Sequence, residues 1–298
     1  MTSAMSAAGL GKRYGRKWAL RGCTLDLPEG RIAALVGPNG AGKTTLLHLA
    51  IGLIEPTEGG IEVVGSRAAS TPDQLRRIGF LAQDAPVYPT LSIADHLRFG
   101  RHMNSGWDDA FARRRIEELG LDLRQRAGKL SGGQRAQLAL TLALAKRPEL
   151  LLLDEPVASL DPLARRDFLA TLTSYVAENE ITVVLSSHLL ADLERVCDHV
   201  VLVSAGKVQL AGDVDAVLAR HRRLVGPQRD VATLPADQHV VWSSSTDRQT
   251  TVVVCTDGPI HDPAWQVDEL SLEDVVLAYM GGGSDTAPPA RPALGVAR

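Results

Sequence analysis

The stretch Gly37-Pro38-Asn39-Gly40-Ala41-Gly42-Lys43-Thr44 matches the phosphate-binding pattern Gly-x-x-x-x-Gly-Lys-[Ser/Thr]. An apolar run at residues 31–36, which predicts a buried strand, precedes it, and a helical pattern over residues 44–51 follows it. The glycines let successive backbone N–H groups face inward, and the helix directs its positive end to the same point. Lys43 can reach phosphates as a point charge, and Thr44 can offer a hydroxyl to Mg²⁺. The sequence therefore predicts a strand–loop–helix unit that binds nucleotide phosphates.

Two acidic residues, Asp154 and Glu155, follow the apolar run at residues 150–153. A run without alternation is typical of a central parallel strand that is covered on both faces. Ligands of open α/β sheets bind beyond the carboxyl ends of the strands, so we expect Asp154 to lie near the phosphate loop and to hold Mg²⁺ directly or through water. Glu155 is a candidate to accept a proton from an attacking water. The alternative is a turn with two solvated acids.

A third motif, Leu130-Ser131-Gly132-Gly133-Gln134, precedes an Ala- and Leu-rich helical run at residues 135–145. Ser131 is a suitable N-cap, and the two glycines leave the first N–H groups of the helix accessible to an anion. Considered alone, the motif is more simply interpreted as an ordinary capped helix. It stands, however, between the phosphate loop and the acidic pair in the chain.

With these motifs in this order, the sequence resembles the ATP-binding cassette (ABC) ATPases. The phosphate loop and the strand before Asp154 and Glu155 resemble the two Walker motifs, and residues 130–134 resemble the signature loop. Further landmarks appear in order, namely Tyr14, Gln83, Ser159-Leu160-Asp161 and His188. The resemblance covers about residues 5–223 and implies an α/β P-loop NTPase of the ABC ATPase type. This fold has a mixed sheet core, an antiparallel β subdomain and a helical subdomain.

The resemblance also implies a role for each matched residue. The residues implied to be catalytic are Lys43, Gln83, Glu155 and His188. Glu155 would be the general base, and His188 would hold the γ-phosphate. Thr44, Gln83 and Asp154 would hold Mg²⁺, and Tyr14 would stack on adenine, with Trp18 as a competing aromatic side chain. The other residues implied to bind ATP are Gly37, Pro38, Asn39, Gly40, Ala41, Gly42, Lys43, Thr44, Thr45, Ser131, Gly132, Gly133, Gln134 and Asp161.

The same resemblance implies a dimer of ATPase subunits, either a homodimer or a heterodimer. Ser131, Gly132 and Gly133 would close over the ATP of the other subunit, and Asp161 would couple the two sites. A rigid domain cannot fold its signature helix onto its own phosphate loop, whereas two head-to-tail copies can bury two ATP molecules between them. We therefore expect an ATP hydrolase whose cofactors are ATP and Mg²⁺.

Composition excludes several other classes of protein. The chain has 298 residues, of which 45% are apolar and 22% charged, and its net charge of −3 argues against a generally cationic nucleic-acid-binding surface. No apolar run approaches the ~20 residues needed to cross a bilayer. The three separated cysteines form no disulfide framework, which suits a reducing cytosol, and residues 1–9 do not resemble a secretory leader.

If the chain drives transport, the pore must be a separate membrane permease, and the chain would lie on the cytoplasmic face of the cell membrane. The branch of the family that serves drug, antibiotic and lipid exporters is resembled by three segments, at residues 88–92, 91–99 and 271–280. Export is therefore the main prediction, and an importer is the alternative. A non-transport ABC ATPase acting on nucleic acid or ribosomes is a further alternative. It is disfavoured by a low aromatic content of 4%, and the basic residues 220–223 are more simply the end of a helix.

Three regions are expected along the chain. Residues 1–223 would form the nucleotide-binding domain, with its helical subdomain at about residues 92–146. Residues 224–280 would form a small α+β extension with two strand-like runs, at residues 239–244 and 250–256, and a helix at residues 271–280. Residues 281–298, rich in glycine and proline, would form a disordered tail.

Overall fold

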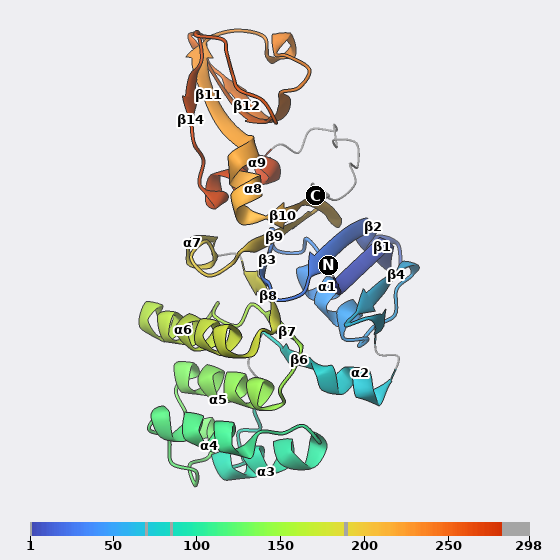
Figure 1. Cartoon of the computed structure of the whole chain (residues 1–298), viewed down its shortest axis with the longest axis vertical. Coiled ribbons are helices and arrows are strands. Elements are labelled where there is room, and N and C mark those ends of the chain that lie inside the picture. Colours follow the sequence, from blue (N-terminus) through green and yellow to red (C-terminus); the bar gives the residue numbers. More distant parts are fainter. Residues whose placement is uncertain (1, 69–70, 84–85, 188–189, 282–298) are drawn as a thin grey trace.

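The computed structural model describes residues 2–68, 71–83, 86–187 and 190–281. A six-stranded mixed sheet forms its centre, in the order β10-β9-β3-β8-β7-β6, with the edge strand β10 antiparallel and the other neighbours parallel (Figure 1). The strands are β3 (Ile32–Val36), β6 (Ile78–Leu81), β7 (Leu150–Asp154), β8 (Thr182–Ser187), β9 (His199–Ser204) and β10 (Lys207–Asp213).

Side chains on the two faces of this sheet enter two different cores. On one face, α1 (Lys43–Ala50) and a second, antiparallel sheet enclose alternate residues of β3, β7, β8 and β9. On the other face, α5 (Gly132–Ala145) and α6 (Pro162–Asn179) cover the remaining residues of the same strands. Since both faces are covered, β3, β7 and β8 are buried throughout, which explains the apolar runs at residues 32–36, 150–153 and 183–185.

The antiparallel sheet has the order β2-β1-β4-β5 and lies to the right in Figure 1. Its strands are β1 (Ser3–Tyr14), β2 (Lys17–Pro28), β4 (Glu58–Val63) and β5 (Ser66–Arg67). The helical subdomain lies at the bottom of the same view and has its own apolar core. It contains α3 (Ile93–Met103), α4 (Asp109–Glu118), η1 (Ala127–Lys129) and α5, while the short α2 (Pro72–Arg77) precedes β6.

This architecture confirms the predicted fold class, because the mixed core sheet, the antiparallel sheet and the group of helices are all present. The strand and helix on either side of the phosphate loop are β3 and α1, and the apolar run at residues 150–153 is β7. Local pattern was sufficient here because each run is short, apolar and bounded by glycine or charged residues.

The C-terminal region differs from its prediction. After α7 (Leu190–Leu193) and α8 (Val214–Arg220), the chain forms a four-stranded antiparallel sheet of order β12-β13-β11-β14, where only two strand-like runs were predicted. The boundary predicted after Arg223 lies inside β11 (His221–Pro227), a central strand of that sheet. The other elements are η2 (Val231–Thr233), β12 (His239–Ser245), β13 (Gln249–Cys255), β14 (Gln266–Asp268) and α9 (Leu272–Gly281).

The basic residues at positions 220–223 were expected to end a helix, and only Arg220 does so. The next three belong to β11, because His221 and Leu224 are buried in the sheet and its neighbours. The arginines are engaged within the chain. Arg220 pairs with Asp257 at 2.6 Å, Arg223 pairs with Asp274 at 2.8 Å, and Arg222 donates to the carbonyl of Leu218 at 2.9 Å.

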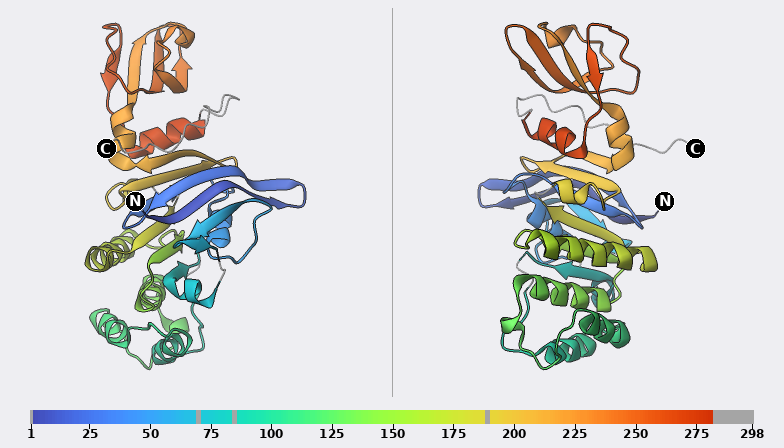
Figure 2. Two further views of the ribbon diagram at one scale, coloured as in Figure 1. Left: turned by 45° about the vertical axis from the view of Figure 1, so that its right-hand side comes forward. Right: turned by 90° about the vertical axis from the view of Figure 1, so that its left-hand side faces the viewer.

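Helix α9 ties the C-terminal sheet to the main core. It lies between that sheet and the central sheet in both views of Figure 2. Its buried residues, including Leu272, Val275 and Val276, pack in the same cluster as β8 and α6, and Val253 of β13 joins them. The region is therefore not a separate globule. The predicted disordered tail starts at Gly281, which is instead the last residue of α9, and residues 282–298 lie outside the described part.

Across the described ranges, none of the helices is long and apolar enough to span a membrane.

Candidate nucleotide-binding site

The phosphate loop joins β3 to α1 and needs glycine at two positions for steric reasons. Gly37 has φ 148°, and a Cβ atom there would lie 2.0 Å from the carbonyl oxygen of Val203 on β9. Gly42 has φ 110°, and a Cβ atom there would lie 2.7 Å from the carbonyl oxygen of Ala19 on β2. A side chain at either position would force the loop away from its neighbours. The loop is therefore a fixed backbone cradle.

Helix α1 begins at this cradle without a side-chain cap, since its N-cap residue is Gly42. The first N–H groups of the helix are thus accessible to an anion, which the helix dipole also favours. Lys43 is buried, and its Nζ donates to the carbonyl oxygen of Gly37 at 2.8 Å. Thr44 is exposed and Thr45 partly buried on the first turn of the helix. This arrangement fits a polyphosphate group.

The acidic pair lies at the carboxyl end of β7 and reaches the phosphate loop. The Oε1 atom of Glu155 is 3.3 Å from Nζ of Lys43, and both side chains are more than nine-tenths buried. Asp154 is 2% exposed. Glu155 has φ 49°, a backbone conformation that is uncommon for a residue other than glycine. The residues predicted from two distant motifs thus lie in one place.

Ser186 of β8, which is not among the predicted site residues, bridges the acidic pair. Its hydroxyl donates to Oδ1 of Asp154 at 2.8 Å and accepts from the backbone N–H of Glu155 at 2.8 Å. The signal that could have revealed it is weak: a hydroxyl residue that follows the apolar run at residues 183–185 near the carboxyl end of the strand.

The donors predicted for a metal ion are oxygen atoms. Asp154 supplies a buried carboxylate, Thr44 an exposed hydroxyl and Gln83 an exposed side-chain amide. Carboxylate and neutral oxygen donors, few in number and accompanied by phosphate and water, are the set that Mg²⁺ prefers. The residues therefore fit Mg²⁺ bound together with a nucleotide.

The candidate adenine platform is the hairpin of β1 and β2. Tyr14 is the last residue of β1 and is 51% exposed, and Nζ of Lys12 lies 5.4 Å from its ring centroid. Trp18 is partly buried and packs over Gly11, with Arg13 5.4 Å from its ring centroid. Tyr14 is thus the more accessible of the two rings, and its stacking role stays a prediction.

The signature residues form a regular helix start. Ser131 accepts from the N–H of Gln134 at 3.2 Å, and the Gln134 side chain accepts from the N–H of Ser131 at 3.0 Å. This capping box engages the Gln134 side chain, so its implied contact with ATP would require the cap to open. Ser131, Gly132 and Gln134 are exposed and Gly133 is partly so, and α5 packs on α3, α4, α6 and β6.

Two further predicted residues have different outcomes. Asp161 caps α6, where its Oδ1 accepts from the N–H groups of Leu163 at 3.0 Å and Ala164 at 2.9 Å. That local role explains the residue type, and its coupling role across a dimer stays a prediction. His188 lies outside the described residues.

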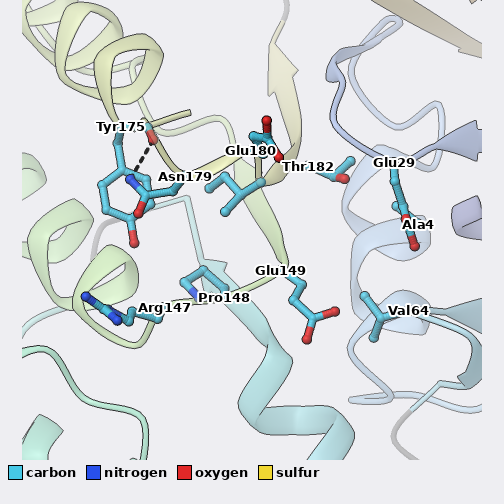
Figure 3. Close-up of a pocket in the computed structure, with 11 residues that line it drawn as sticks. Ala4, Glu29, Val64, Arg147, Pro148, Glu149, Tyr175, Asn179, Glu180 and Thr182 are labelled. Atoms are coloured by element: carbon cyan, nitrogen blue, oxygen red, sulfur yellow. Dashed lines mark hydrogen bonds between the residues drawn. The ribbon is translucent and has the colours of Figure 1, made fainter. Parts of the chain in front are cut away.

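The amino ends of β7 and β8, opposite the site, border a cavity of about 370 Å³. Its lining includes Glu149, Tyr175 and Thr182, and Asn179 donates to the carbonyl oxygen of Tyr175 at 2.9 Å (Figure 3). None of the residues predicted for ATP binding lines this cavity.

Comparison with known proteins identifies the family. The sequence model of the family described as ABC transporter matches residues 20–158 of this chain. The bacitracin transport ATP-binding protein BcrA of Bacillus licheniformis is 31% identical, and the match covers 95% of this chain and 99% of BcrA. The molybdenum import ATP-binding protein ModC of Mesorhizobium japonicum is 38% identical over 67% of this chain, and the chain spans 56% of its length. The aliphatic sulfonates import ATP-binding protein SsuB of Shigella flexneri is 38% identical over 72% of this chain and 81% of SsuB.

Solved structures agree with these sequences. The ATP-binding subunit of an ABC transporter has a TM-score of 0.65 and 30% identity, and the match covers 73% of this chain and 92% of that one. A dimeric ATP-binding cassette bound to ADP and Pi shares the fold, with a TM-score of 0.62 at 23% identity. Most of the curated relatives carry import names, so the predicted export branch is not confirmed and the import alternative is better supported. The chain belongs to the family of ATP-binding proteins of ABC transporters.

Proposed function

We propose that this chain binds Mg-ATP at the phosphate loop and hydrolyses it to drive a separate membrane permease. The observation that carries the proposal is the meeting of Lys43 and Glu155, 3.3 Å apart, at the carboxyl ends of β3 and β7. A buried cation beside a fixed anion cradle and a buried carboxylate are the groups that phosphoryl transfer to water requires.

The resting contacts suggest how these residues act when nucleotide binds. Lys43 is held by Glu155 and by the carbonyl oxygen of Gly37, both of which a phosphate group would replace as partners. Glu155 would then be released to accept a proton from water. Mg²⁺, bound by Thr44, Asp154 and Gln83, would neutralise charge on the phosphates. Binding of ATP would thus replace the partners of Lys43 and, in the same exchange, free Glu155 to act as the base.

Dimerisation is supported by the exposure of the signature residues. Ser131 and Gly132 are at the surface, at the start of a helix whose dipole favours an anion. We propose that they complete the site of a second subunit. His188 is assigned to the γ-phosphate on the family resemblance alone.

We propose that the permease binds at a surface that includes Tyr88, Phe99 and Met103. Tyr88 is 58%, Phe99 51% and Met103 65% exposed, and the rings of Tyr88 and Phe99 are 6.2 Å apart. Exposed aromatic side chains that gather in one place are typical of interaction sites. The chain would work at the cytoplasmic face of the membrane, where ATP is present.

The relatives support uptake as the direction of transport, since ModC, SsuB and others carry import names. A second candidate is transport of an antibiotic-like peptide, favoured by the end-to-end match to the bacitracin transport protein, which includes the C-terminal sheet. Deletion of the gene separates the two. Uptake predicts a growth defect on a limiting nutrient, whereas the second candidate predicts altered sensitivity to bacitracin-like peptides.

A mixing experiment tests the shared site. A Ser131→Arg chain and a Lys43→Ala chain should each hydrolyse ATP poorly, because each disables both sites of its own homodimer. Their mixture should recover part of the activity, because one site then combines an intact phosphate loop with an intact signature. Phosphate release is the measurement, with mixed dimers verified by two affinity tags. Verified mixed dimers without recovery would contradict the shared site.

A further inference from the structure

We propose that Ser186 is a positioning residue that holds both acidic residues of the site, so that Asp154 presents its carboxylate to the metal of Mg-ATP. The proposal rests on the proposed function. It adds a residue of β8, the strand between the phosphate loop and the acidic pair, to the machinery of the site.

The position of Ser186 follows from the strand order. β8 lies between β3 and β7 in the central sheet. Ser186 is in register with Leu35 of β3 and with Asp154 of β7. It is therefore level with the ends of both strands and is the neighbour of Asp154 across the ladder. No other strand separates the two loops that carry the nucleotide chemistry.

The hydroxyl of Ser186 has one proton, and its hydrogen bond goes to Asp154. The hydroxyl donates to Oδ1 of Asp154 at 2.8 Å, and its own oxygen, Oγ of Ser186, accepts from the backbone N–H of Glu155 at 2.8 Å. Ser186 is fully buried and Asp154 nearly so, so water cannot replace these bonds easily. One carboxylate oxygen is thereby fixed, which sets the plane of the carboxylate and the direction of its other oxygen.

The second bond acts on Glu155. Its backbone has φ 49°, and the bond from its N–H to Ser186 anchors the residue in that conformation. From there its side chain reaches Nζ of Lys43 at 3.3 Å. Loss of the hydroxyl would release the carboxylate plane of Asp154 and the backbone of Glu155 together.

A matched control is available on the same strand. Thr182 is also buried, and its Oγ1 accepts from the N–H of Gly30 at 2.9 Å. It is the first residue of β8, four positions away and about 13 Å along the strand. Thr182→Val removes a buried hydroxyl at the end of β8 that lies away from the site, whereas Ser186→Ala removes a buried hydroxyl within the site.

The experiment measures the affinity for a fluorescent ATP analogue with Mg²⁺ and with EDTA, in full-length protein whose thermal unfolding is recorded in parallel. We expect Ser186→Ala to reduce the gain in affinity due to Mg²⁺ by about fivefold or more, and to leave the affinity in EDTA unchanged. Thr182→Val should keep the wild-type gain. A folded Ser186→Ala protein with the wild-type gain would overturn the proposal.

Two more variants keep the test decisive if Ser186→Ala does not fold. Ser186→Thr keeps the hydroxyl, whereas Ser186→Cys keeps the size but has a much weaker hydrogen-bond donor. The Thr variant should retain the Mg²⁺ gain and the Cys variant should lose it, and equal gains in the two would overturn the proposal. If wild-type protein does not bind the analogue in either condition, the proposed function itself fails, an outcome distinct from failure at Ser186.

Discussion

The strands that carry the site and the strands of the C-terminal sheet are built differently. β3, β7 and β8 are buried along their whole length between two layers, whereas β12 and β14 are exposed over most of theirs. The relatives show a parallel contrast: the ModC and SsuB matches cover 67% and 72% of this chain, and the BcrA match covers 95%. The family model lies within the cassette, at residues 20–158, and the match to BcrA is long enough to include the C-terminal sheet.

This difference indicates where chemistry constrains sequence. In the cassette, the strands must place particular side chains within a few ångströms of one another. Nζ of Lys43 and Oε1 of Glu155, for example, are 3.3 Å apart. In the C-terminal sheet, the small core of Leu224, Val252, Val254 and Trp265 needs only apolar side chains of suitable size. Substitutions should therefore affect turnover in the first region and folding in the second.

The largest effect is expected for Glu155→Gln. Loss of the general base should lower ATP turnover about 10²- to 10⁴-fold and leave nucleotide binding intact. Phosphate release and binding of a fluorescent ATP analogue measure the two properties, and size-exclusion chromatography should show a trapped dimer with Mg-ATP. A variant with normal turnover would remove Glu155 from the role of base.

Trp265→Ala should have the next largest effect, this time on stability. The indole is 6% exposed, lies against Gly226 and has the Arg229 guanidinium 4.6 Å from its ring centroid. Its truncation should cost about 3–5 kcal/mol by leaving a cavity, as seen for large buried aromatic side chains. Thermal unfolding and limited proteolysis would report the loss.

We expect the Trp265→Ala variant to keep its affinity for ATP, because the core around Trp265 contains none of the residues predicted for the nucleotide site. Tyr88→Ala, which truncates an exposed aromatic side chain, is the control and should change stability by less than about 0.5 kcal/mol. A loss of ATP binding in a Trp265→Ala protein that is still folded would show that the two regions are more tightly coupled than we infer.

The smallest effect is expected from pH, through His221 at the junction of the two regions. Burial lowers the pKa of His221, whose Nδ1 donates to the carbonyl oxygen of Val217 at 2.7 Å and whose Nε2 accepts from Tyr279 at 3.1 Å. The unfolded chain therefore binds more protons than the folded chain once pH falls below about 6.5. Stability should be highest above that pH and should decrease as the solution is acidified.

Thermal unfolding at pH 7.5 and 5.5 tests this sign, with His221→Gln as the comparison protein. His199, whose pKa burial also lowers, contributes in the same direction and remains in both proteins. The variant should thus lose less stability on acidification than the wild type. An equal loss in both would assign the pH effect to other groups.

Much of the site was predictable because its motifs are local. The phosphate loop needs glycines at fixed spacing before a helix, and Asp154 and Glu155 directly follow their strand. Ser186 was not predictable in the same way. Its role depends on β8 lying between β3 and β7, and residue types along a single strand do not report the order of strands.

The C-terminal sheet illustrates the same limit. The runs that became β12 and β13 alternate or are rich in valine, and were predicted. β11 begins with His221, Arg222 and Arg223, which suit a helix end equally well, and it is a strand because β13 and β14 pair with it on both sides. Likewise, α9 was predicted as a helix, but nothing in its sequence indicated that it would pack into the cassette core.

The sequence by itself therefore determined the family, the fold class and the residues of the loop and the acidic pair, because backbone geometry and charge act there over a few consecutive positions. Only the tertiary structure decided that Lys43 pairs with Glu155, that Ser186 bridges the acids, and that α9 joins the two sheets. These contacts connect residues that are far apart in the chain, and their free energy arises from burial and hydrogen bonding that exist only once the strands have assembled.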